Sequence, residues 1–321
     1  MTSLAAASAA VPNEAMLADV RAGLAREQKE LSPKYFYDRA GSQLFEEITT
    51  LPEYYLTRTE RRLLGRTMPG LASRLRPATL VELGAGAADK TRVILDAMRD
   101  AGSAALYVPV DVSASFLHDA AARLRDAYPG LGVTPVVADF TEPMRFPPAM
   151  PRPVLFAFLG STIGNFDERA SVELLSRVRD AMRPNDRLLL GADLVKDVAR
   201  IELAYNDARG VTAAFNRNVL HMLNRELGAD FDPARFAHRA FFNRDASRIE
   251  MHLVSLGEQR VCVPGVGLVP FRDGETIRTE ISCKYDRAAV ARLFAAAELR
   301  IDEWLVDVEE PYALAVGVVD A

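Results

Sequence analysis

From Ala78 onward, short apolar segments alternate along the chain with longer segments that repeat apolar residues every three or four positions. The short segments predict strands, at 79–83, 106–111, 133–139, 154–160 and 187–194. The longer segments predict amphipathic helices, at 89–100, 113–128 and 168–182, with Ser113 and Asp167 as the N-caps of the last two. The strand segments lack in–out alternation, which is typical of strands buried on both faces. This order of elements predicts an α/β fold with a parallel sheet.

The pattern changes after Leu194. A wholly helical segment is expected first, over 198–231. Alternating segments separated by Pro and Gly then predict antiparallel strands over 248–256, 259–271 and 276–285. The end of the chain predicts a helix over 286–299 and two strands over 300–308 and 311–319. Such an antiparallel pair of strands is typical of the edge of an open α/β sheet. We therefore expect two domains, a sheet domain of 60–199 and 284–321, and an α+β substrate-binding domain of 1–59 and 200–283.

A glycine pair follows the first predicted strand, in ELGAGAADKT. Gly84 and Gly86 suit a tight turn where the backbone approaches a ligand. A dinucleotide fingerprint needs a third glycine where Asp89 stands, and no phosphate-binding P-loop sequence is present. The carboxylate of Asp89 near a helix N-terminus disfavours a pyrophosphate. A zwitterionic amino-acid group meets no such objection, and Lys90 is positioned to pair with its carboxylate.

Acidic residues also end the second and third predicted strands. Asp111 can accept both hydroxyls of a ribose, and Asp139 can accept an adenine amino group beside the ring of Phe140. Each acid alone is as typical of a turn or a helix cap. Ligands of open α/β sheets bind at the carboxyl ends of the strands. Together with the glycine loop, these acids therefore favour S-adenosyl-L-methionine.

Composition narrows the class of protein. The net charge of -5 argues against a nucleic-acid partner, and no apolar run approaches the length of a membrane span. The N-terminal segment lacks a cationic leader. Two cysteines fit a reducing cytoplasm, and the four histidines show no metal-ligand spacing. We expect a cytoplasmic monomer without a metal.

Several motifs resemble those of the histidine Nα-methyltransferases of ergothioneine biosynthesis, namely YFYDRAGSQLFEEIT, LPEYYLTRTE, ELGAGAADKT, FLGSTIGNF, GVTAAFNRNVL, RIEMHL and TEISCKY. The resemblance runs from about Leu31 to the C-terminus and includes the segment inserted in the sheet domain. It implies a class I S-adenosylmethionine-dependent methyltransferase fold (Rossmann-like) with the second domain inserted. It also implies trimethylation of the α-amine of L-histidine to give hercynine. Two positions depart from the family, because Leu56 stands where Pro is usual and Ala85 where Ser is usual.

The resemblance also implies two sets of binding residues. The cofactor would be bound by residues of the predicted sheet, which are Gly84, Lys90, Asp111, Asp139 and Phe140. Histidine would be bound by Tyr54, Asn165, Tyr205, Glu280 and Ser282, with Tyr37, Gly160 and Met251 nearby. No dedicated catalytic base is expected, because an amine with a pKa near 8 loses its proton readily around neutrality. Asn165 and Tyr37 would position the amine for in-line attack on the methyl group.

Each substrate residue also has a structural interpretation. Alternation in TIRTEISCKY places Arg278, Glu280, Ser282 and Lys284 on one face, and from the pattern alone that face is expected in solvent. Under the resemblance, Glu280 accepts an imidazole N–H and Ser282 meets the neighbouring edge of the ring. Asn165 is equally typical of a turn, and Tyr54 of a surface turn. Tyr205 and Met251 are typical core residues, and under the resemblance Met251 forms a wall beside the imidazole.

Other functions stay open at this point. A methyltransferase for another amino acid or an indole-derived amine is the nearest alternative, although an indole needs a pocket without an acid. A non-catalytic sensor of an adenosyl ligand could keep the same fold. A dehydrogenase is disfavoured by Asp89, and an RNA methyltransferase by the acidic charge balance.

Overall fold

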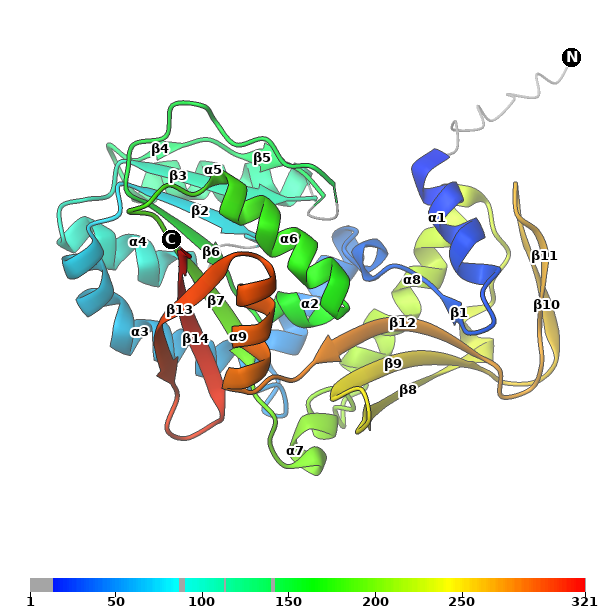
Figure 1. Cartoon of the computed structure of the whole chain (residues 1–321). Helices are drawn as coiled ribbons and strands as arrows, with labels where there is room; N and C mark the ends of the chain where they lie inside the picture. The colour runs from blue at the N-terminus through cyan, green and yellow to red at the C-terminus, as the bar shows by residue number, and fades with distance from the viewer. Residues whose placement is uncertain (1–13, 87–89, 113, 140–141, 321) are drawn as a thin grey trace, which may run out of the picture. The chain divides into compact units, whose positions relative to one another are not determined.

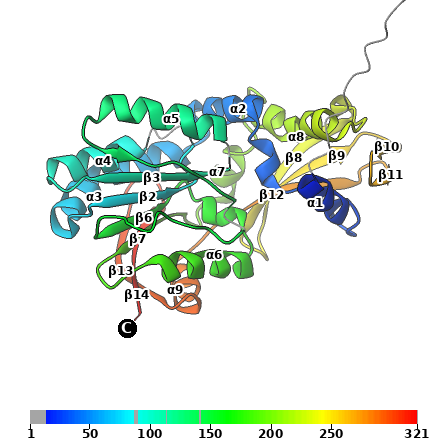
Figure 2. The same cartoon turned by 90° about the horizontal axis from the view of Figure 1, so that it is seen from above.

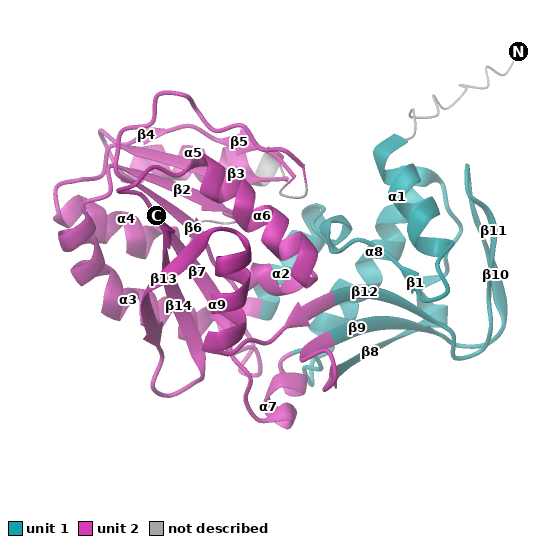
Figure 3. Ribbon diagram, in the orientation of Figure 1, with its two compact units in different colours: residues 1–48, 205–241, 250–280 teal, residues 49–204, 242–249, 281–321 magenta. Residues whose placement is uncertain are grey.

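The computed structural model describes residues 14–86, 90–112, 114–139 and 142–320. The chain folds into two compact units, which Figure 3 colours separately. Unit 1 combines residues 1–48, 205–241 and 250–280, and unit 2 combines residues 49–204, 242–249 and 281–321. Within the described ranges, no helix has both the length and the apolar content needed to cross a membrane.

Unit 2 is built on the large sheet of Figure 1. Its strands lie in the order β13 (Leu299–Val306), β14 (Tyr312–Val319), β7 (Arg187–Asp193), β6 (Val154–Phe158), β2 (Thr79–Leu83), β3 (Leu106–Asp111) and β4 (Gly132–Val133), and β5 (Val136–Val137) also pairs with β3. Strands β2 to β7 pair in parallel, whereas β14 runs antiparallel to both β7 and β13. The predicted parallel sheet with an antiparallel end is thus confirmed.

Helices cover both faces of this sheet (Figure 2). One face is covered by α3 (Leu56–Leu75), α4 (Thr91–Asp100) and α5 (Ala114–Ala127), and the other by α6 (Glu168–Ala181) and α9 (Arg287–Ala296). Neighbouring strand residues enter opposite cores, as Leu80 and Val81 do. Because both faces are buried, the strands need no polar side chains, and this explains why their sequences do not alternate.

Two predictions about the elements of the sheet domain can be followed further. The side chain of Asp167 accepts the Ala170 N–H at 2.8 Å and caps α6, as predicted, whereas Ser113 lies outside the described residues. The predicted third strand is shorter than expected, because it consists of the two-residue strands β4 and β5.

The prediction of one helix over 198–231 is wrong. The segment forms α7 (Val198–Leu203) and α8 (Val211–Leu227) with a turn between them. The Asp207 carboxylate accepts the N–H groups of Val211 and Thr212 at 2.9 and 2.8 Å, and Gly210 has φ 72°, a left-handed conformation. These hydrogen bonds to the Asp207 side chain begin a new helix at Val211 and interrupt the single helix that the apolar periodicity predicts.

Unit 1 contains most of a four-stranded sheet with the order β1 (Lys29–Glu30), β12 (Thr276–Cys283), β9 (Arg248–Ser255) and β8 (Phe236–Asn243). It also contains α8, the hairpin of β10 (Gln259–Val263) and β11 (Gly267–Phe271), and the helices α1 (Glu14–Leu24) and most of α2 (Arg39–Thr50). Strand β1 pairs in parallel with β12, so the N-terminal segment is part of this sheet. Strand β8 was not predicted, because its apolar positions show no regular period.

Candidate functional site

The glycine loop after β2 is tied to the end of β3. Gly84 and Gly86 have φ values of 72° and 49°, where side chains with a Cβ are disfavoured. The Gly84 N–H donates to the Val110 carbonyl at 2.8 Å, and the Gly86 N–H donates to Asp111 Oδ2 at 3.1 Å. The structure therefore brings the loop and the Asp111 carboxylate together, as expected for two parts of one ligand site.

This loop lies where the strand order reverses. Strand β2 pairs with β3 on one side and with β6 on the other. In open α/β sheets, ligands bind at this reversal, outside the carboxyl ends of the strands. Asp139 follows β5, which pairs with β3 beside Asp111. Phe140, the predicted adenine neighbour, lies outside the described residues.

Lys90 is held by a buried carboxylate that the sequence did not predict. Glu60, in α3, is fully buried and pairs with Lys90 at 2.5 Å. Glu60 Oε1 also accepts the Gly160 N–H at 2.7 Å and the Tyr312 O–H at 2.6 Å. Gly160 has φ 75°, and a Cβ there would lie 3.1 Å from Lys90 Nζ. Lys90 and Gly160, both predicted site residues, are thus neighbours.

The acid that ends the first apolar run has a structural role. Glu82 is buried, and its Oε2 accepts hydrogen bonds from Thr91 Oγ1 at 2.5 Å and from the Tyr107 O–H at 2.7 Å. Burial raises the pKa of the Glu82 carboxyl. Glu82 therefore supports the interior of unit 2, and Asp111 and Asp139 remain the candidate ligand acids.

Asn165 lies in the short helix η2 (Thr162–Asn165), which packs on the end of β12. Just before η2, Ser161 adopts φ 56°, and its Oγ accepts the Asp193 N–H at 3.0 Å. A Cβ on Gly164 would lie 2.9 Å from the Cys283 carbonyl oxygen and 3.6 Å from the Ser282 carbonyl carbon. Glycine at 164 is what allows this approach, and it places Asn165 near the backbone of Ser282.

The polar face of β12 is not solvated, so the expectation from alternation alone is wrong. Glu280 is 9% exposed, and Ser282 and Lys284 are each 3% exposed. Lys284 Nζ donates to Ser282 Oγ at 2.9 Å and pairs with Asp193 Oδ2 at 3.0 Å. Buried polar side chains must be hydrogen-bonded or serve a ligand. This burial makes β12 a candidate binding surface.

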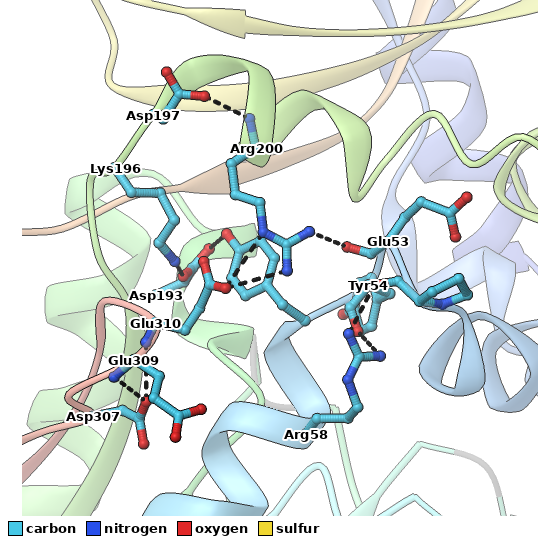
Figure 4. Close-up of polar contacts among 12 residues, drawn as sticks. Glu53, Tyr54, Arg58, Asp193, Lys196, Asp197, Arg200, Asp307, Glu309 and Glu310 are labelled. Atoms are coloured by element: carbon cyan, nitrogen blue, oxygen red, sulfur yellow. Dashed lines mark hydrogen bonds and ion pairs between the residues drawn. The ribbon is translucent and has the colours of Figure 1, made fainter.

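Asp193 ends β7 at the centre of a buried charged cluster, which we define as Asp193, Lys196, Lys284 and Tyr55 (Figure 4 labels Asp193 and Lys196). Its carboxylate accepts from Lys196 at 2.5 Å and from the Tyr55 O–H at 2.7 Å. Lys196 Nζ lies 4.0 Å from the centre of the Tyr55 ring. Burial lowers the pKa of Lys196, although the charge of Asp193 opposes that shift.

Tyr54 is buried rather than a surface turn residue, with 8% of its surface exposed. Its backbone carbonyl accepts from Arg58 Nη1 at 3.0 Å (Figure 4). The same guanidinium nitrogen donates to the Leu51 carbonyl at 2.6 Å. Arg58 therefore fixes the backbone of the turn that carries Tyr54.

In unit 1, a neutral network supports Tyr205 and Met251. Asn216 Nδ2 donates to the His252 carbonyl at 3.1 Å and lies 2.9 Å from His238 Nδ1. Because the amide nitrogen is a donor, His238 Nδ1 is the acceptor, and His238 Nε2–H donates to the Tyr205 carbonyl at 2.9 Å. Thr279 Oγ1 donates to Asn216 Oδ1 at 2.6 Å and lies 3.1 Å from the Met251 carbonyl. We call Asn216, His238, Thr279 and the carbonyls they contact the neutral network.

Tyr37, also in unit 1, is half-buried in an aromatic group. Its ring lies edge-on to those of Phe45 and Phe215, each at a centroid distance of 5.7 Å. The candidate residues therefore fall into two sets, which are Gly84, Lys90, Asp111, Asp139, Tyr54, Gly160, Asn165 and Ser282 in unit 2, and Tyr37, Tyr205, Met251 and Glu280 in unit 1.

The sequence matches the family described as "Histidine-specific methyltransferase, SAM-dependent" over residues 16–318. The chain belongs to this family. It is 48% identical to the histidine N-alpha-methyltransferase of Mycolicibacterium smegmatis over 98% of this chain and 97% of that protein. It is 47% identical to the enzyme of the same name from Mycobacterium tuberculosis, over 94% of each chain. The resemblance seen in the sequence is thus confirmed.

A solved S-adenosylmethionine-dependent methyltransferase from Clostridium acetobutylicum has the same fold, with a TM-score of 0.51 over 87% of this chain and 99% of that one. Its sequence is 10% identical, so this likeness concerns the fold alone. The predicted fold class and the predicted cofactor, S-adenosylmethionine, are confirmed. Lys90 and the Asp111 carboxylate fit that cofactor, because they place a cation and an acceptor at the reversal of strand order, beside a glycine loop that allows close approach of the backbone.

Proposed function

We propose that this protein transfers methyl groups from S-adenosylmethionine to the α-amine of L-histidine, three times, to give hercynine. One observation carries the choice of histidine within this family. The polar face of β12 is buried, and it presents a carboxylate at Glu280 and a hydroxyl at Ser282. An acid and a hydroxyl two residues apart on one strand face suit a ring that has polar atoms on its edge.

The cofactor residues act through the contacts of unit 2. Asp111, held by the Gly86 N–H, would accept the ribose hydroxyls, and Asp139 with Phe140 would meet the adenine. Lys90 would pair with the carboxylate of the amino-acid part of the cofactor while Glu60 retains its contacts to Gly160 and Tyr312. The bound cofactor supplies a methyl group already activated by a sulfonium.

Glu280 determines the choice of side chain. Its carboxylate accepts the imidazole N–H in a charge-assisted hydrogen bond. A phenyl or aliphatic side chain offers no N–H to this buried acid, so the charge-assisted hydrogen bond is lost and phenylalanine and leucine are rejected. Met251, which is 1% exposed, would contribute the apolar wall beside the ring.

The reacting amine needs alignment more than it needs a base. Asn165 and Tyr37 hold the nitrogen by hydrogen bonds that carry no charge, so the lone pair stays available for in-line attack. Tyr54 and Tyr205 bind the carboxylate of the amino acid through their hydroxyls. We assign cofactor binding mainly to residues 60–199 and 284–321, and substrate binding mainly to 1–59 and 200–283. The protein is a cytoplasmic monomer in this proposal.

The test is direct. Purified protein is incubated with S-adenosylmethionine and each of histidine, tryptophan, tyrosine and phenylalanine, and the products are separated by mass spectrometry. Mono-, di- and trimethylated histidine are expected, with no product from the other three amino acids. Methylated tryptophan or tyrosine without methylated histidine would contradict the substrate assignment. No methylated amino acid at all, with cofactor binding intact, would favour a non-catalytic sensor.

A further inference from the structure

Glu60, in α3, is a fully buried acid whose two oxygens contact different segments of unit 2. Oε2 pairs with Lys90 Nζ at 2.5 Å. Oε1 accepts the Gly160 N–H at 2.7 Å and the Tyr312 O–H at 2.6 Å. A buried ion pair is a weak source of stability, because its desolvation cost offsets much of the attraction between the charges. Stability alone therefore does not explain why an acid stands at position 60.

The middle of β7 leaves room for this carboxylate. Gly191 lies in a buried strand segment whose neighbouring positions, Leu190 and Ala192, pack in the core. A Cβ on Gly191 would overlap Glu60 Oε1 and would lie 2.7 Å from the Tyr312 hydroxyl oxygen. Glycine at position 191 is therefore required for the Glu60 carboxylate to occupy this place.

The contacts of Glu60 connect two loops at the carboxyl ends of neighbouring strands. Lys90 lies between the glycine loop after β2 and the start of α4, and Gly160 follows β6, which pairs with β2. The side chain of Lys90 is 23% exposed, whereas that of Glu60 is not exposed. The lysine is therefore the member of the ion pair that a ligand can reach, and the acid supports it from the interior.

We propose that Glu60 is a positioning residue that holds Lys90 Nζ beside Gly160 and so directs the ammonium at the carboxylate of the cofactor. The inference rests on the part of the proposed function that assigns Lys90 to the cofactor. An ammonium can donate three hydrogen bonds, so contacts with Glu60 and with a ligand carboxylate are compatible. A lysine side chain has many rotamers, and fixing one in advance lowers the entropy cost of binding.

Charge alone predicts the opposite effect of removing Glu60. Without this carboxylate, the charge of Lys90 is no longer balanced, and its attraction for a ligand carboxylate increases. Glu60→Gln separates the two effects, because glutamine keeps the size of the side chain and removes its charge. The amide has a single acceptor oxygen, so if that oxygen accepts from Lys90, the amide nitrogen faces the Gly160 N–H, and the reverse also holds. Lys90 then loses its fixed position.

The experiment compares two ligands that share an adenosine and a sulfur atom. S-adenosylhomocysteine carries the amino-acid part of the cofactor, and 5′-methylthioadenosine lacks it. We expect Glu60→Gln to raise the Kd of S-adenosylhomocysteine about tenfold, as loss of a hydrogen bond to a charged group does. The Kd of 5′-methylthioadenosine should stay at the wild-type value. Calorimetric titration measures both constants.

Asp186→Asn is the matched control. Asp186 is also a buried acid of unit 2 that pairs with a basic side chain, Arg152, and accepts a backbone N–H, that of Val154 at 2.7 Å. It directly precedes β7, and Val154 begins β6, so this acid lies at the opposite end of the strands from the two loops. We expect Asp186→Asn to lower the free energy of unfolding and to keep both Kd values.

Two results would overturn the inference. An unchanged or lower Kd of S-adenosylhomocysteine in Glu60→Gln would mean that Glu60 only balances the charge of Lys90. An equal rise in Kd for both ligands would mean that Glu60 only supports the interior of unit 2.

Tyr312→Phe decides if Glu60→Gln does not fold, because it removes one donor to Glu60 and keeps the aromatic ring. We expect the Kd of S-adenosylhomocysteine to rise about two- to fivefold, with no rise for 5′-methylthioadenosine. An unchanged ratio of the two constants would contradict the inference. A wild-type protein that binds S-adenosylhomocysteine but does not methylate histidine would instead refute the proposed function and leave the role of Glu60 in place.

Discussion

Each of the two units contains a buried cluster of polar side chains, but the side chains are charged in unit 2 and neutral in unit 1. In unit 2 the charged cluster places Asp193 in contact with two lysines and a tyrosine hydroxyl. In unit 1 the neutral network uses the Asn216 amide, a neutral histidine and a threonine hydroxyl. The segment of β12 contributes to both, because Thr279 of β12 joins the neutral network and Lys284, the residue after β12, joins the charged cluster.

The two clusters differ in the cost of burying their polar groups. An amide and a hydroxyl can be satisfied in pairs at little cost, and the neutral network accordingly connects backbone carbonyls, including that of Tyr205. Charged groups carry a large desolvation cost, and a buried ion pair offsets it only when further hydrogen bonds satisfy the remaining donors and acceptors. In the charged cluster, Tyr55 donates such a hydrogen bond to Asp193, and Ser282 accepts one from Lys284.

The largest expected effect comes from removing the centre of the charged cluster. Asp193→Ala leaves two buried ammonium groups without their carboxylate, and we expect the free energy of unfolding to fall by about 3–5 kcal/mol. Urea denaturation measures it. Asp197→Ala is the control, because Asp197 is exposed and caps α7, so its loss costs about 1 kcal/mol. A similar loss in the two variants would show that Asp193 does not balance the buried lysines.

Glu280→Ala is expected to weaken the binding of histidine rather than to lower the free energy of unfolding. Loss of a charge-assisted hydrogen bond worth about 1.5–3 kcal/mol weakens histidine binding by about 10- to 150-fold. Binding of S-adenosylhomocysteine should not change, and calorimetric titration of each ligand measures both. Glu280→Gln, whose amide oxygen still accepts an N–H, should lose less affinity than Glu280→Ala. Equal losses for histidine and S-adenosylhomocysteine would mean that Glu280 is structural.

Asn216→Ala tests the neutral network. It removes the nearer acceptor of Thr279 Oγ1 and a donor to the His252 carbonyl, and we expect a loss of about 1–3 kcal/mol in the free energy of unfolding. Asn206→Ala, which removes an exposed amide that donates to the Ala240 carbonyl, is the matched control and should cost less. A loss from Asn216→Ala as large as that from Asp193→Ala would remove the contrast between neutral and charged burial.

The smallest effect concerns pH. Burial lowers the pKa of His238 and of His252 below that of a free histidine. As the pH falls, the unfolded chain therefore protonates these histidines before the folded chain does. The stabilisation that each neutral histidine contributes is complete above about pH 6.5 and is lost as the pH falls towards the pKa of the folded state. Each histidine adds up to about 1.4 kcal/mol per pH unit to the decrease in the free energy of unfolding. Denaturant unfolding at pH 7, 6 and 5 should show a shallower fall in His238→Gln, and an unchanged slope would contradict the shift.

Local periodicity was sufficient to predict most of unit 2. Strands β2, β3, β6 and β7 and their helices follow from apolar spacing, because burial of each element depends on its own residues. The break between α7 and α8 was missed, since it depends on the Asp207 carboxylate and on a left-handed glycine within an apolar pattern. Strand β8 gave no regular signal.

The site was predictable only in part. Alternation in β12 identified which side chains share a face, but not whether that face meets solvent or protein. The contact of Glu60 with the site could not be predicted from local sequence, because its partners Gly160 and Tyr312 lie 100 and 252 positions away. Lys284 could have been found, since it continues the polar face that carries Glu280 and Ser282.

The position of the transferred methyl group distinguishes methylation of the α-amine from methylation of the imidazole ring. Wild-type protein is supplied with L-histidine and S-adenosylmethionine that carries an isotopically labelled methyl group, and the product is assigned by NMR and tandem mass spectrometry. We expect label on the α-nitrogen alone, ending at the trimethylated product, because the proposed function has the ring held by Glu280 and Ser282. Label on a ring nitrogen, or histidine recovered without label, would contradict it.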